Sequence, residues 1–376
     1  MALSARKPAI PALTGVRFLA ALSVALFHLS FQLAASLNIP TGHFFDNAGE
    51  PVELFFMLSG FILTYTHSDV STVNRAATSQ FYLSRFAKIY PMYLLGWLVF
   101  APLIYINLVS LHGPGPGTYA RLAFYGVMSI TLMQAWIPAT ANAWNTPGWS
   151  LSAEAFFYAL FPLLFASLKH RTVRALIALI ALCWLISVVP TIVVSMLPKP
   201  FSTVQWPQDA ANFMPVLRIA EFIAGICMGR LYLDRSSERS WAFDLAAALA
   251  LVLAVAAMLF SNYLHARVVL FPVFFALLYC LARASGPLSR LLGSKVMVLL
   301  GEASFAFYIL HVPLFKYAKI AVPSVATSPL QFSIFLVALT GVSIFCYLSI
   351  EKPLCAYLRR AYRTPPVARV PATLQR

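Results

Sequence analysis

The sequence predicts an all-α integral membrane protein, a bundle of about ten transmembrane helices. Its 376 residues are 60% hydrophobic and only 10% charged, and the mean hydropathy is +0.79. A water-soluble domain could not bury so much apolar surface, so the excess must face lipid. Apolar stretches of about 20 residues recur along the chain, long enough to cross hydrocarbon as helices. Helices satisfy their own backbone hydrogen bonds, which a spanning segment requires.

Ten stretches are long and apolar enough to be spans. In chain order they are Thr14 to Leu37, Val52 to His67, Ile89 to Val109, Leu151 to Leu168, Val173 to Leu197, Phe213 to Leu233, Trp241 to Phe260, His265 to Leu281, Val296 to Lys319 and Leu330 to Ile350. An eleventh apolar stretch, Arg121 to Trp136, is shorter and precedes a segment rich in Pro, Asn and Gly.

The basic residues between the spans predict the orientation. Loops on the cytoplasmic side carry an excess of Lys and Arg. With the N-terminus inside and ten crossings, all but six of the 27 basic residues fall on the cytoplasmic side; the six are Arg121, Lys199, Arg218, Arg267, Lys316 and Lys319. We therefore expect both termini to be cytoplasmic.

The stretch from Arg121 to Trp136 is predicted not to cross the membrane. A crossing there would place the cluster of Lys169, Arg171 and Arg174 outside and invert every later loop. We expect this stretch to dip into the outer leaflet or to pack against the bundle. Such segments are tolerated where they are buried in protein or line an aqueous cavity, so we expect a cavity on the outer side.

The domain organisation predicted is one membrane domain over residues 1–358, followed by a basic cytoplasmic tail over residues 359–376. The apolar run after Arg6 and Lys7 is too long for a cleavable signal sequence, so we expect it to be retained as the first helix.

The net charge of +15 does not indicate nucleic-acid binding. The basic residues form short clusters between apolar stretches and not one patch with interleaved aromatic residues. Five cysteines show no CxxC spacing, and four of them lie in predicted spans: Cys183, Cys227, Cys280 and Cys346. We expect no disulfide and no metal site.

Two ionisable residues in the first span share one helix face. Arg17 and His28 are eleven residues apart, close to three full turns, which places His28 about 16 Å deeper than Arg17. An ionisable side chain inside a span needs a partner or a function. His28 could simply bond to a neighbouring helix, or it could act as a general base or nucleophile, since its side chain titrates near neutrality.

A second histidine, His311, lies on a face with Gly301, Ser304 and Tyr308, at intervals of three and four residues. Small residues permit close helix approach, so packing and catalysis both remain open as explanations.

The segment NTPGWSLSAEAFFYALFP predicts a chain break followed by a helix at the outer side. Its first turns would bring Trp149, Ser150 and Glu154 to the external mouth of the bundle. Trp149 could be an interfacial anchor and Glu154 a helix-start charge. A tryptophan with a carboxylate can also hold a sugar by stacking and hydrogen bonding.

Arg85 and Lys88 lie three residues apart near the cytoplasmic start of the third span. Both could extend to lipid phosphates. The sharper alternative is a phosphate clamp for a soluble cytoplasmic donor.

Taken in order, six stretches resemble the membrane acyltransferase-3 family, which includes O-antigen and exopolysaccharide acetylases. They are LTGVRFLAALSVALFH, VELFFMLSGFILTY, FYLSRFAKIYPMYL, GWSLSAEAFFYALFPLL, GEASFAFYILHVPLF and IEKP. Together they cover nearly the whole chain.

The resemblance implies that acyl-CoA, usually acetyl-CoA, binds on the cytoplasmic side and that hydroxyls of sugars or other acceptors are acylated. Arg17 and His28 match the family's first-helix arginine and essential histidine, and Arg85 matches the first basic residue of its R-x-x-R motif. Lys88 replaces the second arginine, which keeps the charge but loses the planar fork. Glu53 stands where many members have aspartate.

Further implications concern the place and the partners of the activity. The chain ends shortly after IEKP, so we expect no fused esterase-like domain. We expect a bacterial inner membrane location, with the lipid bilayer, acyl-CoA and a carbohydrate or glycolipid acceptor as partners, and no tightly bound cofactor.

The mechanism expected assigns His28, Arg17 and Glu154 to catalysis and Arg85 and Lys88 to acyl-CoA. His28 would either accept the acyl group or deprotonate the acceptor hydroxyl. A cavity with Trp149, Ser150, Tyr308 and His311 would hold the acceptor.

The main rival is a multi-span transporter or flippase with His28, Glu154 and His311 on its path, but we find no inverted repeat in the sequence. A receptor-like or structural membrane protein is the third possibility.

Overall fold

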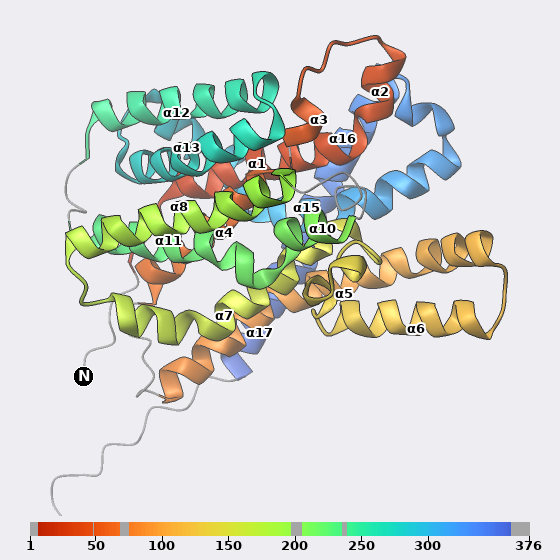
Figure 1. The fold of residues 1–376 in the computed structure, drawn as a ribbon, viewed down its shortest axis with the longest axis horizontal. Helices are drawn as coiled ribbons and strands as arrows, with labels where there is room; N and C mark the ends of the chain where they lie inside the picture. Colours follow the sequence, from red (N-terminus) through yellow and green to blue (C-terminus); the bar gives the residue numbers. More distant parts are fainter. Residues whose placement is uncertain (1–6, 48, 68–74, 197–204, 235–238, 362–376) are drawn as a thin grey trace, which may run out of the picture.

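A computed structural model describes residues 7–47, 49–67, 75–196, 205–234 and 239–361, and their regular secondary structure is helical (Figure 1). The α-helices are α1 (Pro11–Leu29), α2 (Phe31–Ser36), α3 (Phe44–Asn47), α4 (Pro51–Thr66), α5 (Arg75–His112), α6 (Pro116–Ile130), α7 (Trp149–Leu168), α8 (Val173–Met196), α10 (Gln205–Phe213), α11 (Pro215–Asp234), α12 (Trp241–Phe260), α13 (Tyr263–Arg283), α14 (Pro287–Leu292), α15 (Lys295–Ala321), α16 (Pro329–Cys346) and α17 (Lys352–Ala361). Short 3₁₀ turns η1 (Gln134–Trp136), η2 (Pro138–Thr140), η3 (Thr146–Gly148) and η4 (Pro323–Ala326), and a π-helical turn η5 (Tyr347–Glu351), join them.

The all-α membrane fold predicted from composition is confirmed. Within the described ranges, nine helices are long and apolar enough to cross a membrane, and α4 adds a shorter apolar helix of 16 residues. These ten correspond in order to the ten predicted spans. Large apolar side chains stay exposed along α8 and α12, such as Ile177, Leu182, Leu249 and Val252, and lipid is the environment that accommodates them.

Two predicted spans have wrong ends. The first was expected to reach Leu37, but α1 stops at Leu29, where the Ser30 hydroxyl donates to the Leu26 carbonyl and the chain restarts as α2. The third was expected to begin at Ile89. Helix α5 begins earlier, at Arg75, because the more polar residues before Ile89 are helical too.

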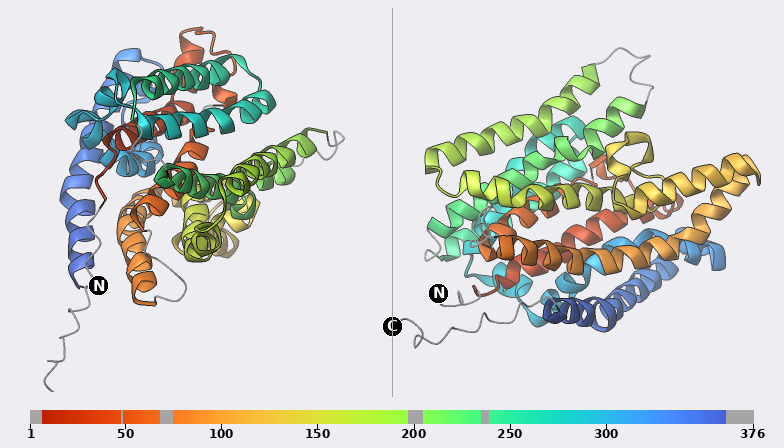
Figure 2. Two further views of the ribbon diagram at one scale, coloured as in Figure 1. Left: turned by 90° about the vertical axis from the view of Figure 1, so that its left-hand side faces the viewer. Right: turned by 90° about the horizontal axis from the view of Figure 1, so that it is seen from below.

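The stretch that was predicted not to span, Arg121 to Trp136, covers most of α6, a helix of 15 residues, and ends with η1. It lies beside the second half of α5, and the two form a hairpin that projects at one side of the bundle (Figures 1 and 2). The turns η1, η2 and η3 then lead into α7. At the other end of the chain, α17 runs across the predicted tail boundary at residue 359, and the rest of the tail, 362–376, lies outside the described residues.

Glycines let two helix pairs approach closely. A Cβ built on Gly301 of α15 would lie 1.9 Å from the Thr14 carbonyl oxygen of α1, and one built on Gly225 of α11 would lie 2.0 Å from the Met57 carbonyl oxygen of α4. Only glycine fits at such contacts between membrane helices. The Gly301 end of the predicted Gly301–His311 face therefore packs against α1.

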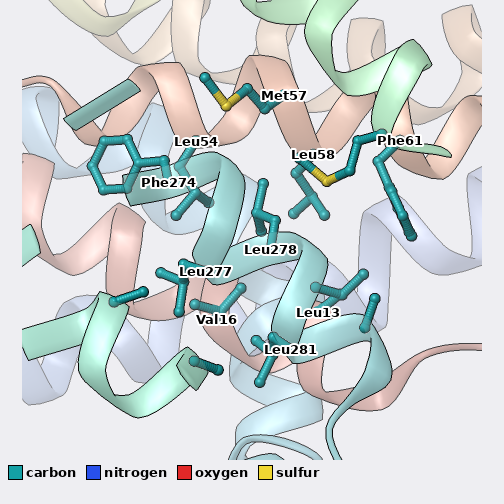
Figure 3. Packing of buried hydrophobic residues seen from close by; sticks show 14 of the residues in the cluster. Leu13, Val16, Leu54, Met57, Leu58, Phe61, Phe274, Leu277, Leu278 and Leu281 are labelled. Carbon is teal, nitrogen blue, oxygen red and sulfur yellow. The ribbon is translucent and has the colours of Figure 1, made fainter. Parts of the chain in front are cut away.

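Figure 3 shows the apolar packing between α13, α4 and α1. Leu277 and Leu278 of α13 lie between Leu54 and Leu58 of α4 and Val16 of α1, and all of them are buried. This packing fixes α1 and α4, two of the helices that supply residues to the cavities described next.

Candidate active site

In the part of the bundle that the structure describes, two neighbouring cavities meet at Tyr308 and Val52, which line both. We call the end of the bundle where α1 begins the near end, and the end where α1 finishes the far end. The near cavity, of about 150 Å³, has as its polar lining Arg17, Ser59, Arg85, Lys88, Ser150, Glu154, Tyr158, Ser304 and Tyr308. The far cavity, of about 340 Å³, has His28, Glu50, Asn142, Thr146, Trp149, Asn212, Arg218, Arg267 and Tyr308.

The near cavity collects basic side chains from two helices. Arg17 comes from α1, and Arg85 and Lys88 come from α5. The Arg17 guanidinium makes no ion pair or hydrogen bond with any residue that the structure describes. The Arg85 guanidinium donates to the Ser84 hydroxyl and lies 5.9 Å from the centre of the Phe81 ring. Arg17, at the cavity wall and without a carboxylate partner among the described residues, suits an anionic ligand.

Lys88 has partners from the end of the chain. Its ammonium pairs with the buried carboxylate of Glu351 in η5, and Glu302 of α15 lies 3.9 Å away. Lys88 therefore ties α5 to η5 and α15 as well as lining the cavity. The sequence gives no sign of this, since 263 residues separate Lys88 from Glu351.

Glu154 is held by two hydroxyl groups. The Ser59 hydroxyl of α4 donates to its Oε1 over 2.6 Å, and the Tyr158 hydroxyl, one turn further along α7, donates to the same oxygen over 2.7 Å. Glu154 lines the near cavity together with both donors.

His28 lies in the far cavity, next to a second histidine. The ring centres of His28 and His311 are 5.3 Å apart, and the Phe27 ring centre is 4.7 Å from that of His28. His311 is fully buried, and its Nδ1 lies 2.7 Å from the Tyr308 carbonyl oxygen. A carbonyl only accepts, so Nδ1 carries the hydrogen and Nε2 is the lone-pair nitrogen. Nε2 has no hydrogen-bond partner among the described residues.

Trp149 forms part of the far cavity with polar neighbours. Its ring centre lies 5.9 Å from the Arg218 guanidinium and 5.1 Å from the Phe213 ring centre. Asn142, Thr146 and Asn212 line the same cavity. An aromatic ring with amide and hydroxyl groups around it can stack on and hydrogen-bond a sugar.

A buried network of charges supports the far cavity, and sequence reasoning missed it. Arg218 of α11 lies 3.7 Å from Glu53 and 3.5 Å from Glu221; Arg267 of α13 lies 3.9 Å from both Glu53 and Glu50. All five side chains are buried. Burial removes the hydration of a charged side chain, and an oppositely charged neighbour offsets that cost. The available signal was the presence of Glu53, Arg218 and Glu221 inside strongly apolar stretches.

Tyr308 forms the partition between the cavities. The Ser150 hydroxyl donates to the Pro147 carbonyl over 2.9 Å, so Tyr308 is the donor in the 3.0 Å contact between the Tyr308 and Ser150 hydroxyls. This bond fixes the tyrosine hydroxyl, and Tyr308 and Val52 are the two residues that line both cavities.

The structure thus divides the predicted site residues into two sets. Arg17, Arg85, Lys88 and Glu154 line the near cavity, while His28 and Trp149 line the far cavity. Ser150 and Tyr308 lie at the partition, and His311 is buried beside His28. Sequence reasoning grouped Glu154 with Trp149 at the external mouth; in the structure Glu154 lies with the basic residues instead.

Comparisons with known proteins agree with the order of motifs in the chain. The profile of an acyltransferase domain family, acyltransferase 3, matches residues 10–348. Acyltransferase MdmB from Streptomyces mycarofaciens is 31% identical over 329 residues, which cover 82% of this chain and 79% of that protein. No solved structure matches the chain.

Proposed function

Because the chain belongs to the acyltransferase-3 family of multi-pass membrane acyltransferases, we propose that it moves an acyl group from acyl-CoA to a sugar hydroxyl. The acyl group is acetyl, the donor is cytoplasmic, and the acceptor is a sugar-containing molecule such as a surface polysaccharide or a glycolipid. The near end of the bundle faces the cytoplasm, and both chain termini are on that side.

The observation that carries this proposal is the pair of unlike cavities that meet at Tyr308. Arg17, Arg85 and Lys88 give the near cavity the cationic wall that phosphate groups of a CoA donor require. Trp149, Asn142 and Asn212 give the far cavity the stacking and hydrogen-bonding surface that a neutral sugar requires.

His28 acts as the general base in this proposal. Its ring lines the far cavity and not the near one, so it meets the acceptor hydroxyl before the donor. The acceptor oxygen attacks the thioester carbonyl as His28 removes its proton. The carbon–sulfur bond breaks, and the protonated His28 gives the proton to the sulfur, so CoA leaves as the thiol. His311, whose ring centre lies 5.3 Å from that of His28, packs beside the base.

The test supplies acetyl-CoA with a radiolabelled acetyl group to membranes that contain the protein and to carbohydrate and glycolipid fractions. We expect label in a carbohydrate-containing fraction, released by mild alkali as O-esters are. Membranes with His28→Ala protein should leave that fraction unlabelled. Equal labelling by the folded His28→Ala protein would overturn the role of His28, and the absence of any acetyl transfer from acetyl-CoA would overturn the choice of donor.

A further inference from the structure

One group of hydrogen-bonded side chains in the near cavity is not used in the transfer step proposed above: Glu154, Ser59 and Tyr158. Both hydroxyls donate to Oε1 of Glu154, and the two hydroxyl oxygens are 3.0 Å apart. Each hydroxyl carries one hydrogen, and both hydrogens point at the same carboxyl oxygen. The carboxyl group is therefore held in one orientation by two helices, α4 and α7.

The other carboxyl oxygen of Glu154, Oε2, receives no hydrogen bond from any residue that the structure describes. The Glu154 side chain is partly exposed and lines the cavity, whereas the Tyr158 ring beside it is buried. Oε2 is thus an acceptor with a fixed position and no protein donor.

The remaining lining of the near cavity supplies no comparable acceptor. Much of it is apolar, from Phe55, Leu58, Ile62, Leu63, Ile89 and Leu151. The Ser304 hydroxyl donates to the Gly301 carbonyl and the Ser150 hydroxyl to the Pro147 carbonyl, each three residues earlier in the chain. The Tyr308 hydroxyl donates to that of Ser150. Among the lining residues that the structure describes, Glu154 is the one carboxyl group.

These features match the parts of an acyl-CoA molecule in sequence. Its phosphates are anionic, its pantetheine arm is neutral but carries amide N–H groups, and its thioester is uncharged and has no hydrogen-bond donor. An amide N–H that enters an apolar cavity without an acceptor loses its hydrogen bond to water, which costs about 1–3 kcal/mol. A cavity with cations, apolar walls and one fixed carboxyl oxygen meets these needs.

We propose that Oε2 of Glu154 accepts a hydrogen bond from an amide N–H of the donor's pantetheine arm, and that Ser59 and Tyr158 are positioning residues for this carboxyl group. The inference rests on the proposed function, because it takes acyl-CoA as the donor.

The proposal makes a specific statement about Glu154→Gln. The Ser59 and Tyr158 hydroxyls keep an oxygen at the position of Oε1, so the new amide NH₂ takes the position of Oε2. The variant then presents a donor where the wild type presents an acceptor. The Gln NH₂ group should weaken binding of a donor with an amide N–H at this place and tolerate a donor with an ester oxygen there.

The experiment compares acetyl-CoA with two analogues in which one or the other pantetheine amide is replaced by an ester. We measure KM and kcat for each donor with the full-length wild type, Glu154→Gln, Ser59→Ala, Tyr158→Phe, and Ser167→Ala as a control. Ser167 is exposed on α7 and donates to the Leu163 and Leu164 carbonyls of its own helix.

We expect one ester analogue to have a KM roughly tenfold above that of acetyl-CoA in the wild type and in Ser167→Ala. Glu154→Gln should abolish or reverse this preference, with the change in KM rather than in kcat. Ser59→Ala and Tyr158→Phe, which each remove one donor from Oε1, should reduce the preference by a few fold.

If the wild type and folded Glu154→Gln prefer acetyl-CoA over the ester analogues to the same extent, the inference is overturned. It is also overturned if the wild type shows no preference between acetyl-CoA and the analogues. Both results leave the proposed function intact. If Glu154→Gln does not fold, an unchanged preference in both Ser59→Ala and Tyr158→Phe overturns it instead. A wild type that uses no acyl-CoA overturns both proposals.

Discussion

The cations at the two ends of the bundle have different surroundings. At the far end, Arg218 and Arg267 lie among three carboxylates, those of Glu50, Glu53 and Glu221. At the near end, Arg17 lines a cavity and has no carboxylate partner among the described residues. A cation surrounded by carboxylates holds helices together, whereas one that faces a cavity without them can bind an anion.

This contrast separates the roles of the two cavities. The far cavity is lined by charges that the protein has already compensated, so it can accept a neutral acceptor beside His28. The near cavity keeps positive charge for a ligand. Variants at the two ends should therefore fail in different ways.

The largest effect is expected for His28→Ala, the far-end variant at the proposed base. Removing a general base lowers the rate of acyl transfer by about 10² to 10⁴. The transfer of labelled acetyl groups at saturating acetyl-CoA measures this loss. His170→Ala is the matched control, because His170 is exposed between α7 and α8. A loss of the same size in both variants would contradict the assignment.

The second-largest effect is expected for Glu53→Ala, and it is a loss of stability instead of a loss of transfer rate. This change leaves Arg218 and Arg267 with one carboxylate fewer in a buried site, which should destabilise the protein by about 3–5 kcal/mol. Thermal unfolding of the purified protein measures it.

Asp234→Asn provides the control for Glu53→Ala. Asp234 pairs with Arg230 over 3.4 Å at a partly exposed position, and such pairs contribute at most about 1 kcal/mol. If both variants melt at the same temperature, the far-end network does not hold the helices as we describe.

Arg17→Ala should have a smaller effect that is confined to the donor. Loss of a charged hydrogen bond to phosphate raises the KM for acetyl-CoA roughly tenfold or more. The KM for acetyl-pantetheine, which lacks the phosphates, should stay the same. Arg171→Ala, at an exposed position between α7 and α8, is the control. An equal rise in KM for both donors would place Arg17 away from the phosphates.

The smallest effect is expected for Tyr308→Phe, at the partition. The change removes only the hydrogen bond to Ser150, which contributes about 1 kcal/mol to stability. Thermal unfolding should show a small decrease. A loss of several kcal/mol would mean that the hydroxyl has contacts beyond Ser150.

Sequence reasoning predicted the fold well, because hydropathy records how much of each helix faces lipid. It could not predict where helices end when the reason is local, as at Ser30, or where polar turns extend a helix, as in α5. It also could not pair Lys88 with Glu351 or assemble charges from α4, α11 and α13, since contacts between distant segments have no spacing rule.

Helix spacing also did not predict which cavity each site residue lines. Eleven residues of ideal helix place Arg17 and His28 about 20° apart around α1 but about 16 Å apart along its axis, and in the structure they line different cavities. Trp149 and Glu154 are close along α7 but about 140° apart around it, so they face different cavities as well. Which cavity a side chain lines depends both on its angle around the helix and on its position along the helix axis, and sequence reasoning used only one of the two for each pair.

The most direct test of the two-cavity account is donor binding by the variants at its two ends. Binding of labelled acetyl-CoA is measured at equilibrium for the wild type, His28→Ala and Arg17→Ala, all purified as folded protein. We predict that His28→Ala binds within about twofold of the wild type and that Arg17→Ala binds roughly tenfold more weakly. Wild-type binding by Arg17→Ala, or a tenfold loss in His28→Ala, would contradict the separation of donor and base between the two cavities.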